Sequence, residues 1–240
     1  MDNFYQKVIC VDENDKIIGS ALAGRAHSLR YLERHRGFSL FLFDINNRLL
    51  VQKRSKNKFV FPGLWSNTVC SHPFLNPLSF SDPLEDVKNH VIQRAKYELG
   101  INELKTEDLQ FVTRLRYKAI NEDVEGDILD GMPSSQNYFE SECRKDDSIN
   151  NQWGESEIDY IFVCKKEVNI KINSEEVEEC AYISKIKFEQ MLKNKKVSPW
   201  VASVCSFVDI FNICTKIENH PHGTKTTEKN CHREKANEVL

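Results

Sequence analysis

The sequence of 240 residues lacks the features that mark secreted, membrane-spanning or disulfide-stabilised proteins. Its first residues, MDNFYQKVICVDENDK, have neither the basic nor the apolar region of a signal peptide. The longest apolar stretch, WVASVCSFVDIFNIC, is interrupted by Asp209 and is too short to cross a bilayer. The eight cysteines show no CxxC spacing and no disulfide-framework pattern. We therefore expect a soluble, cytoplasmic protein with reduced thiols and no membrane contact.

An excess of positive charge is also absent, because the net charge is -3 and no basic stripe occurs, so no nucleic-acid partner is expected. Negative charge is concentrated in residues 121–150, which hold nine acidic and two basic side chains without periodicity. A structureless segment of this length is uncommon inside a compact domain, and we expect a disordered insertion. The rest of the chain has a small positive net charge, which is compatible with an anionic substrate.

The composition suits one globular domain, expected over residues 1–217, followed by a polar, disordered tail at 218–240. Alternating apolar residues predict two hairpins, formed by segments 7–12 with 16–21 and 37–44 with 48–55. Further strands are expected at 109–119, 157–167 and 179–184. The stretch 56–73 reads as irregular, with a turn at Pro62-Gly63.

The clearest helix lies in SDPLEDVKNHVIQRAKYELGI. Asp82 suits the N-cap, Pro83 the first helical position and Gly100 the end of the helix. Another helix is expected from Ser184. A last helix opens at Ser198-Pro199, and because it is apolar around most of its circumference, it should be buried against the sheet.

Two short motifs place reactive side chains on one side of an extended segment. Residues i and i+2 of a strand point the same way, which applies to Cys70 and His72 in TVCSHP and to Glu155 and Glu157 in WGESEIDY. Two partly buried carboxylates at this spacing need a cation or a shared proton. A divalent cation is therefore one interpretation of the glutamate pair.

Two earlier histidines, His27 and His35, flank SLRYLER and could reach the same centre. Three imidazoles and two carboxylates suit Zn²⁺, Mn²⁺ or Mg²⁺. The spacing alone leaves other interpretations open, since each histidine can be an ordinary core or surface residue and the glutamates can be the solvated face of a strand. A Cys–His nucleophilic pair would need His72 as a free base and a third orienting residue, which the sequence does not indicate.

Longer motifs occur in a specific order: RGFSLFLFD, LLVQKRS, KFVFPGLWSNTVCSHP, YELGI, RLRYKA, WGESEIDYIFV and SPW. From about Lys7 to Ile217, the sequence resembles the type I isopentenyl diphosphate isomerases. The resemblance implies an α+β, single-domain, Nudix-type α/β/α fold with a mixed sheet. It also implies interconversion of isopentenyl and dimethylallyl diphosphate in isoprenoid biosynthesis, by protonation to a tertiary carbocation and loss of a proton from the opposite side.

The resemblance assigns roles by position. Cys70 and Glu157 match the two acid/base groups of the family. Tyr117 matches a tyrosine beside the catalytic carboxylate, and Trp200 matches the aromatic residue that faces the hydrocarbon. Both a thiol and a carboxyl can exchange protons near neutral pH when their surroundings tune them. The matched ligands of the divalent metal are His27, His35, His72, Glu155 and Glu157, and Glu98 matches the ligand of a Mg²⁺ that arrives with the diphosphate.

The resemblance also implies a small diphosphate substrate, bound by Arg54, Lys58 and Arg94. One departure concerns a lysine that the family has four residues before the first histidine ligand. This sequence has Ala23 there, and Arg25 is the candidate to replace the lysine.

Two other functions compete with this interpretation. Nudix pyrophosphohydrolases gather metal ions with the glutamates of REUXEEXGU, but QRAKYELGI keeps only Glu98, because Arg94 and Tyr97 replace the other two. A catalytically inactive homologue that acts as an interaction module would suit the acidic insertion, yet it leaves Cys70 and Glu157 without a role. The isomerase is therefore the preferred interpretation.

Overall fold

The computed structural model of the chain describes residues 5–58, 60–120 and 153–217, so the expected disordered insertion at 121–150 and the tail at 218–240 lie outside the described residues. Nine strands of the described part belong to one mixed sheet. They are β1 (Lys7–Val11), β2 (Ile17–Leu22), β3 (His35–Phe43), β4 (Leu49–Arg54), β5 (Trp65–Ser66), β6 (Val69–Ser71), β7 (Gln110–Ile120), β8 (Gly154–Lys165) and β9 (Val177–Ile183).

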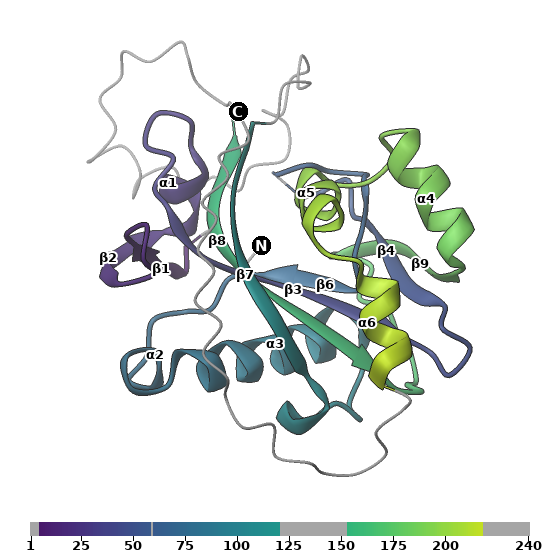
Figure 1. Cartoon of the computed structure of the whole chain (residues 1–240). Helices are drawn as coiled ribbons and strands as arrows, with labels where there is room; N and C mark the ends of the chain where they lie inside the picture. Colours follow the sequence, from purple (N-terminus) through teal and green to yellow (C-terminus); the bar gives the residue numbers. More distant parts are fainter. Residues whose placement is uncertain (1–4, 59, 121–152, 218–240) are drawn as a thin grey trace.

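The helices lie around this sheet (Figure 1). They are α1 (Ala23–His27), α2 (Leu78–Ser81), α3 (Pro83–Leu99), a short 3₁₀ helix (Thr106–Asp108), α4 (Lys185–Lys193), α5 (Pro199–Phe207) and α6 (Ile210–Ile217). The predicted start of α4 is confirmed, since Ser184 is its N-cap and accepts a hydrogen bond from the Lys187 amide.

Strand β3 is the centre of the sheet and is buried along its whole length. One edge of β3 pairs with β8 in parallel, whereas β1, β6 and β4 share the other edge in antiparallel pairing. The first predicted hairpin, β1–β2, is confirmed. The second is only partly correct: β3 and β4 pair at Phe43 and Leu49 and then diverge, because β6 pairs with β3 while β5 and β9 pair with β4. Both short strands, β5 and β6, lie in the stretch that the sequence left irregular.

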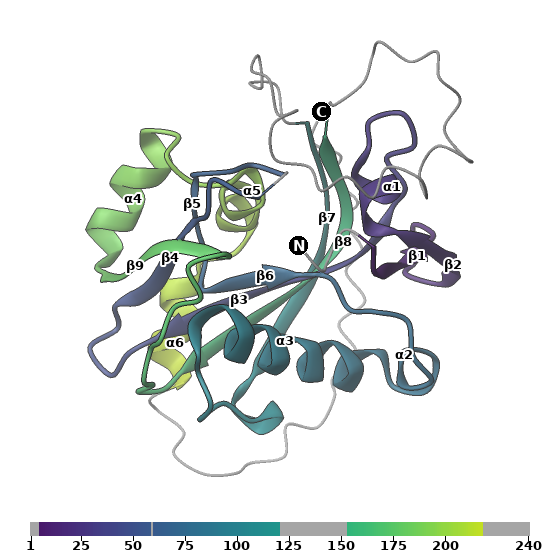
Figure 2. The same cartoon turned by 180° about the vertical axis from the view of Figure 1, so that it is seen from behind.

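Two apolar cores occupy the two faces of the sheet, because successive strand residues point to opposite sides. On one face, α3 packs Val87, Val91 and Leu99 against the even-numbered residues of β3, such as Leu40. On the other face, α4, α5 and α6 cover the odd-numbered residues, such as Phe41. Figure 2 shows α3 on its face from behind. This is the expected α/β/α arrangement.

The predicted limits of α3 are confirmed. The Asp82 side chain accepts a hydrogen bond from the Glu85 amide at 3.1 Å, and Pro83 is the first helical residue. Gly100 ends the helix with a φ of +66°, a left-handed conformation that a residue without Cβ adopts at little cost. Because α3 carries Arg94 and Glu98, these caps fix the position of two predicted site residues.

The last helix is predicted as one segment, but the structure divides it into α5 and α6. The break coincides with Asp209, whose side chain accepts a hydrogen bond from the Asn212 amide and so satisfies the start of α6. Both helices bury apolar side chains on the sheet, as expected. Among the described residues, no single helix is long and apolar enough to cross a membrane, and α5 with α6 meet the length and composition only as a pair bent by 67°.

Candidate active site

The register of the sheet aligns residues that are far apart in sequence. His35 on β3 is paired with Glu157 on β8, and Glu157 is paired with Tyr117 on β7. His72 directly follows β6, whose Ser71 is opposite Phe38 of β3. An isolated bridge between Ser28 and Trp153 joins the end of α1 to the start of β8, so that His27 also reaches this row.

The three histidines form a nearly equilateral triangle. Their ring centroids are 4.6 Å apart for His27 and His35, 4.8 Å for His27 and His72, and 4.7 Å for His35 and His72. One ligand atom from each histidine and one from Glu157 all lie within 4.8 Å of one another. These four side chains therefore form a group that could hold a metal ion, and we call it the His/Glu group.

Backbone carbonyls orient two of the imidazoles in the His/Glu group. Nδ1 of His27 is 2.6 Å from the Ala23 carbonyl oxygen, and Nδ1 of His35 is 2.7 Å from that of Glu33. When Nδ1 donates to these carbonyls, the Nε2 lone pair is left for a metal. The buried Nε2 of His35 has no hydrogen-bond partner among the described residues, although it lies 3.5 Å from Glu157 Oε1. An orphaned nitrogen of this kind fits a metal ligand.

Burial and mutual repulsion keep two of these histidines neutral. Burial, followed by the neighbouring His35, lowers the pKa of both His27 and His72 to about 3. Nε2 of His72 lies 2.7 Å from Glu157 Oε1. Neutral imidazole is the form that binds metal ions, so His27 and His72 are in the form that fits a metal. Burial acts against protonation of His35 as well, but Glu157 outweighs it and raises the pKa of His35.

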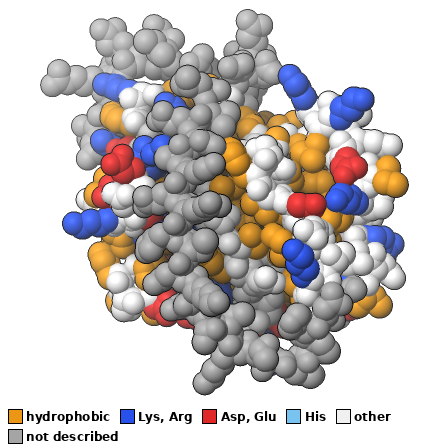
Figure 3. Space-filling model, in the orientation of Figure 1, with side chains coloured by type: hydrophobic (Ala, Val, Ile, Leu, Met, Phe, Trp, Pro, Cys, Tyr) orange, Lys and Arg blue, Asp and Glu red, His pale blue; other side chains and the backbone are white. Residues whose placement is uncertain are grey.

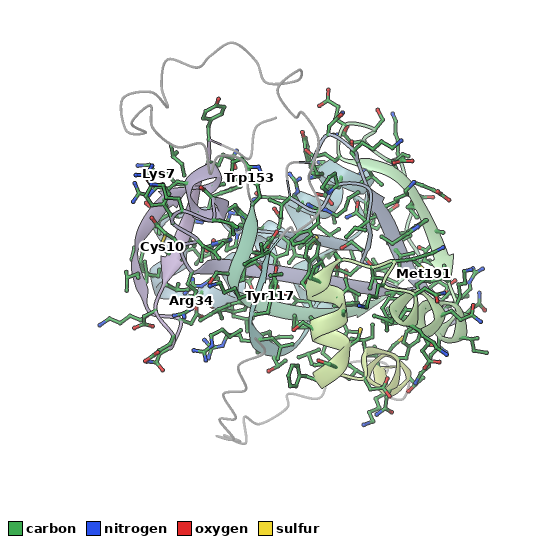
Figure 4. All side chains as sticks on the ribbon, turned by 90° about the horizontal axis from the view of Figure 1, so that it is seen from above. Lys7, Cys10, Arg34, Tyr117, Trp153 and Met191 are labelled. Atoms are coloured by element: carbon green, nitrogen blue, oxygen red, sulfur yellow. The ribbon has the colours of Figure 1, made fainter. Side chains whose placement is uncertain are left out.

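Glu155 lies beside the His/Glu group but is not one of its four members. Burial, and then the charge of Glu157, raises the pKa of Glu155 to about 7. Its Oε2 accepts a hydrogen bond from the Tyr117 hydroxyl at 2.7 Å. Figure 4 shows Tyr117 in the middle of the molecule, and its side chain is buried. The structure thus brings the predicted tyrosine and the two predicted carboxylates together.

A second set of side chains surrounds Cys70, which is paired with Ser39 of β3 in the sheet. Its Sγ lies 3.7 Å from Arg54 Nη1. The Arg54 guanidinium is in turn 5.0 Å from the centroid of the Trp200 ring. Burial raises the pKa of Cys70 to about 12, although Arg54 lowers it in part. The thiol is therefore protonated at neutral pH.

A third set contains Glu98, which is almost completely buried. Its Oε1 accepts a hydrogen bond from Arg94 Nε at 2.8 Å, and its Oε2 accepts one from Gln52 Nε2 at 2.8 Å. Lys58 Nζ lies 3.7 Å from Glu98 Oε1. The sets are electrostatically connected, since Arg54 and Glu98 both act on the pKa of Cys70, and Arg94 acts on that of His72.

Arg25, the candidate to replace the family's lysine, contacts Glu33 and Tyr31. Its Nε forms an ion pair with Glu33 at 2.8 Å, and its guanidinium lies 4.2 Å from the centroid of the Tyr31 ring. The Arg25 side chain is 42% exposed. Its contact with a substrate stays a prediction.

Two residues of the site are not found by the sequence argument. Glu176 binds both Arg94 and Lys58, but it lies in the acidic stretch NSEEVEE, where nothing distinguishes it from its neighbours. Asn67 accepts a hydrogen bond from Trp200 Nε1 at 3.0 Å. Its position inside the motif SNTVCSHP is a signal that could have identified it.

A cavity of about 180 Å³ borders the site between α3 and the segment that follows β6. His72, Arg94, Ser71 and His90 are among the side chains that line it. The cavity therefore gives access to one ligand of the His/Glu group and to one predicted diphosphate-binding residue.

Likeness to solved structures defines the class of fold. The chain resembles DR0079 from Deinococcus radiodurans, with a TM-score of 0.50 and 12% identity, over 80% of this chain and 92% of that chain. A Nudix hydrolase from Alicyclobacillus acidocaldarius matches with a TM-score of 0.42 and 9% identity, over 68% of this chain and 84% of that chain. At 12% identity, the likeness to DR0079 concerns the fold alone. The chain has a Nudix-type α+β fold with a mixed sheet.

Sequence relatives define the family, although no family model matches the chain. Isopentenyl-diphosphate Delta-isomerase 1 of Bos taurus is 36% identical over 204 residues, which cover 80% of this chain and 77% of that protein. The isopentenyl-diphosphate delta-isomerase of Schizosaccharomyces pombe is 32% identical over 208 residues, which cover 82% of this chain and 79% of that protein. The chain therefore belongs to the isopentenyl-diphosphate delta-isomerase family.

Proposed function

We propose that this chain interconverts isopentenyl diphosphate and dimethylallyl diphosphate in the cytoplasm, with Cys70 and Glu157 as the two proton-transfer groups. The observation that carries the proposal is the arrangement of three adjoining sets: the His/Glu group with Glu157, the partly buried thiol of Cys70, and the cations Arg54, Lys58 and Arg94. An allylic isomerisation needs a proton donor, a proton acceptor and a place for the diphosphate, and these sets supply all three.

Cys70 is suited to donate a proton because burial keeps its thiol protonated. Glu157 is suited to the complementary role. Burial opposes its ionisation, but the neighbouring side chains of Glu155 and His35 outweigh it and lower its pKa, so the group is a carboxylate that can accept a proton. The roles exchange when the reaction runs backwards, because the return step uses the same two groups. Tyr117 holds Glu155 through its hydroxyl and so supports the carboxylate side.

His27, His35, His72 and Glu157 would hold a divalent ion. The resemblance of the sequence adds Glu155, which lies beside this group, as a further ligand. Imidazole and carboxylate donors suit Zn²⁺, Mn²⁺ or Mg²⁺. Such an ion supplies a fixed positive charge that orients Glu157 and changes the proton affinity of its carboxylate. Glu98 would hold the Mg²⁺ that accompanies the diphosphate, since its carboxylate lies among the diphosphate-binding cations.

The deciding experiment incubates the purified protein and Mg²⁺ with isopentenyl diphosphate in deuterated water. Deuterium in the dimethylallyl diphosphate supports the isomerase, because the proton that enters the product comes from an exchangeable group. Release of monophosphate or phosphate without isomerisation would instead indicate a Nudix pyrophosphohydrolase. Recovery of unchanged substrate from a folded, metal-loaded sample would favour an inactive homologue.

A further inference from the structure

Glu176 binds two of the three cations of the proposed diphosphate site, Lys58 and Arg94, although the isomerase mechanism gives it no role. Its side chain lies just before β9, and the residue is only 6% exposed. Glu176 Oε2 accepts a hydrogen bond from Arg94 Nη2 at 2.6 Å and also bonds Lys58 Nζ. One carboxylate oxygen therefore binds both cations at once.

The two cations of this cluster are already neutralised. Arg94 uses Nε for Glu98 and Nη2 for Glu176, while Lys58 lies between the same two carboxylates. Among the described residues, two carboxylates thus face two cations. Burial raises the pKa of Glu176, but Lys58 and Arg94 outweigh it and lower the pKa below its usual value. The carboxylate consequently keeps its negative charge at neutral pH.

A bare diphosphate carries several negative charges and would meet repulsion from Glu176 and Glu98 as well as attraction from the cations. Charges within a few ångströms in a mostly buried site are only weakly screened by solvent. Lys58 and Arg94 have side chains that are 17% and 11% exposed, so this cluster is such a site. Complexation by a divalent ion would remove most of the repulsion.

We propose that Glu176 is an internal counter-ion of Lys58 and Arg94 that weakens the binding of a free diphosphate and so selects the complex of diphosphate with a divalent ion. The inference rests on the proposed function only for the identity of the natural diphosphate. Glu176 acts through the two cations, so it is a specificity-determining residue without a part in proton transfer.

Inorganic pyrophosphate is the probe, and calorimetric titration of the full chain measures its binding in EDTA and in Mg²⁺. Glu176→Gln removes the charge but retains the shape and one hydrogen-bond acceptor. In EDTA, Glu176→Gln should bind pyrophosphate about tenfold more tightly than the wild type, a change of about 1.4 kcal/mol. The gain in affinity on adding Mg²⁺ should become smaller in the variant.

Glu178→Gln is the matched control, because Glu178 is a nearby glutamate that is 37% exposed and pairs with Lys53 instead. It should behave like the wild type in both solutions. Arg94→Gln, placed in the Glu176→Gln background, should abolish the gained affinity, which would show that the probe binds at this cluster. Thermal unfolding checks each variant, and Glu176→Ser serves as a second neutral variant if Glu176→Gln does not fold.

Equal or weaker binding of pyrophosphate in EDTA by a folded Glu176→Gln variant would overturn the proposal. The same is true if the Mg²⁺-dependent gain is unchanged. These results are independent of turnover. A protein that passes the pyrophosphate test but incorporates no deuterium would have the proposed counter-ion without the proposed isomerase activity.

Discussion

His35 and Glu157 are 122 positions apart in the sequence but are direct neighbours on the parallel strands β3 and β8, with His35 Nε2 3.5 Å from Glu157 Oε1. Both residues are buried. An imidazole and a carboxylate that face each other inside a sheet need a proton or a cation between them, because an uncompensated buried charge is costly. Their pairing is therefore the central feature of the His/Glu group.

The first prediction concerns the metal content of the purified protein. His35→Ala and Glu157→Gln should each reduce the bound divalent ion by about tenfold or more, since loss even of an outer-shell partner costs this much affinity. Elemental analysis after dialysis measures the ion. Glu178→Gln, an exposed glutamate outside the group, should keep the wild-type content. A His35→Ala variant with undiminished metal would remove this histidine from the ligand set.

The second prediction is that Cys70→Ala and Glu157→Gln each abolish turnover while the protein stays folded. The reason is that two opposed groups must exchange protons with the substrate, and neither alanine nor glutamine can do so. Deuterium incorporation measures turnover, and circular dichroism measures folding. If Cys70→Ala keeps more than about a tenth of the wild-type kcat, the thiol is not one of the two groups, given that acid–base catalysis contributes about a hundredfold or more.

The third prediction follows from the raised pKa of Cys70. The thiolate is the form that reacts with alkylating reagents. Because burial raises the pKa of this thiol to about 12, alkylation of Cys70 by iodoacetamide should be slow at pH 8 and should still increase between pH 9 and pH 10. Peptide mapping by mass spectrometry follows this cysteine alone. A rate that reaches its plateau below pH 8 would mean that Arg54 outweighs the burial.

Local features of the fold could be predicted from the sequence because their causes are local. The caps Asp82 and Gly100 define α3, and Ser184 defines the start of α4, through hydrogen bonds and backbone conformations within a few residues. Asp209 interrupts an apolar stretch of the sequence, but the sequence alone does not indicate that it caps α6. A single polar residue in an apolar helix can be tolerated or can start a new helix, and packing on the sheet decides between the two.

Long-range pairing could not be predicted in the same way. The divergence of β3 and β4 depends on β6, which pairs along β3 over only three residues. The contact of Glu176 with Arg94 depends on the position of α3, which places Arg94 beside the segment before β9. Neither the divergence of β3 and β4 nor the contact of Glu176 with Arg94 produces a periodic pattern in the sequence. The ordered motifs predict a set of site residues, and the register of β3 with β8 explains how His35 and Glu157 of this set meet.

The fourth prediction concerns the acidic insertion. Ile120 and Gly154 are paired in the antiparallel ladder of β7 and β8, so a short turn can connect the two strands. Replacing residues 121–150 with a short Gly-rich linker should therefore leave kcat nearly unchanged, since shortening a loop has a small entropic effect. A deletion variant that folds normally, binds metal and yet fails to isomerise would assign part of the site to the insertion. On the described part of the face drawn in Figure 3, charged side chains are scattered among hydrophobic ones.

The last prediction concerns Trp200, whose buried side chain contacts two other side chains. Its Nε1 donates to Asn67, and its ring lies under the Arg54 guanidinium. A π face can stabilise a carbocation without capturing it, and a desolvated contact of this kind contributes about 2 kcal/mol or more. Trp200→Leu should therefore lower kcat by about tenfold or more, following the rate equivalent of that energy, and change KM little.

Trp200→Phe keeps a π face but loses the donor to Asn67, so it should reduce stability by about 1 kcal/mol with a mild effect on kcat. Steady-state kinetics and thermal unfolding must be measured on the same samples. If Trp200→Leu raises KM and leaves kcat unchanged, the ring serves only to hold Arg54 against the diphosphate. If it loses stability but the folded fraction turns over at the wild-type rate with an unchanged KM, the ring is a packing residue of the core formed with α5.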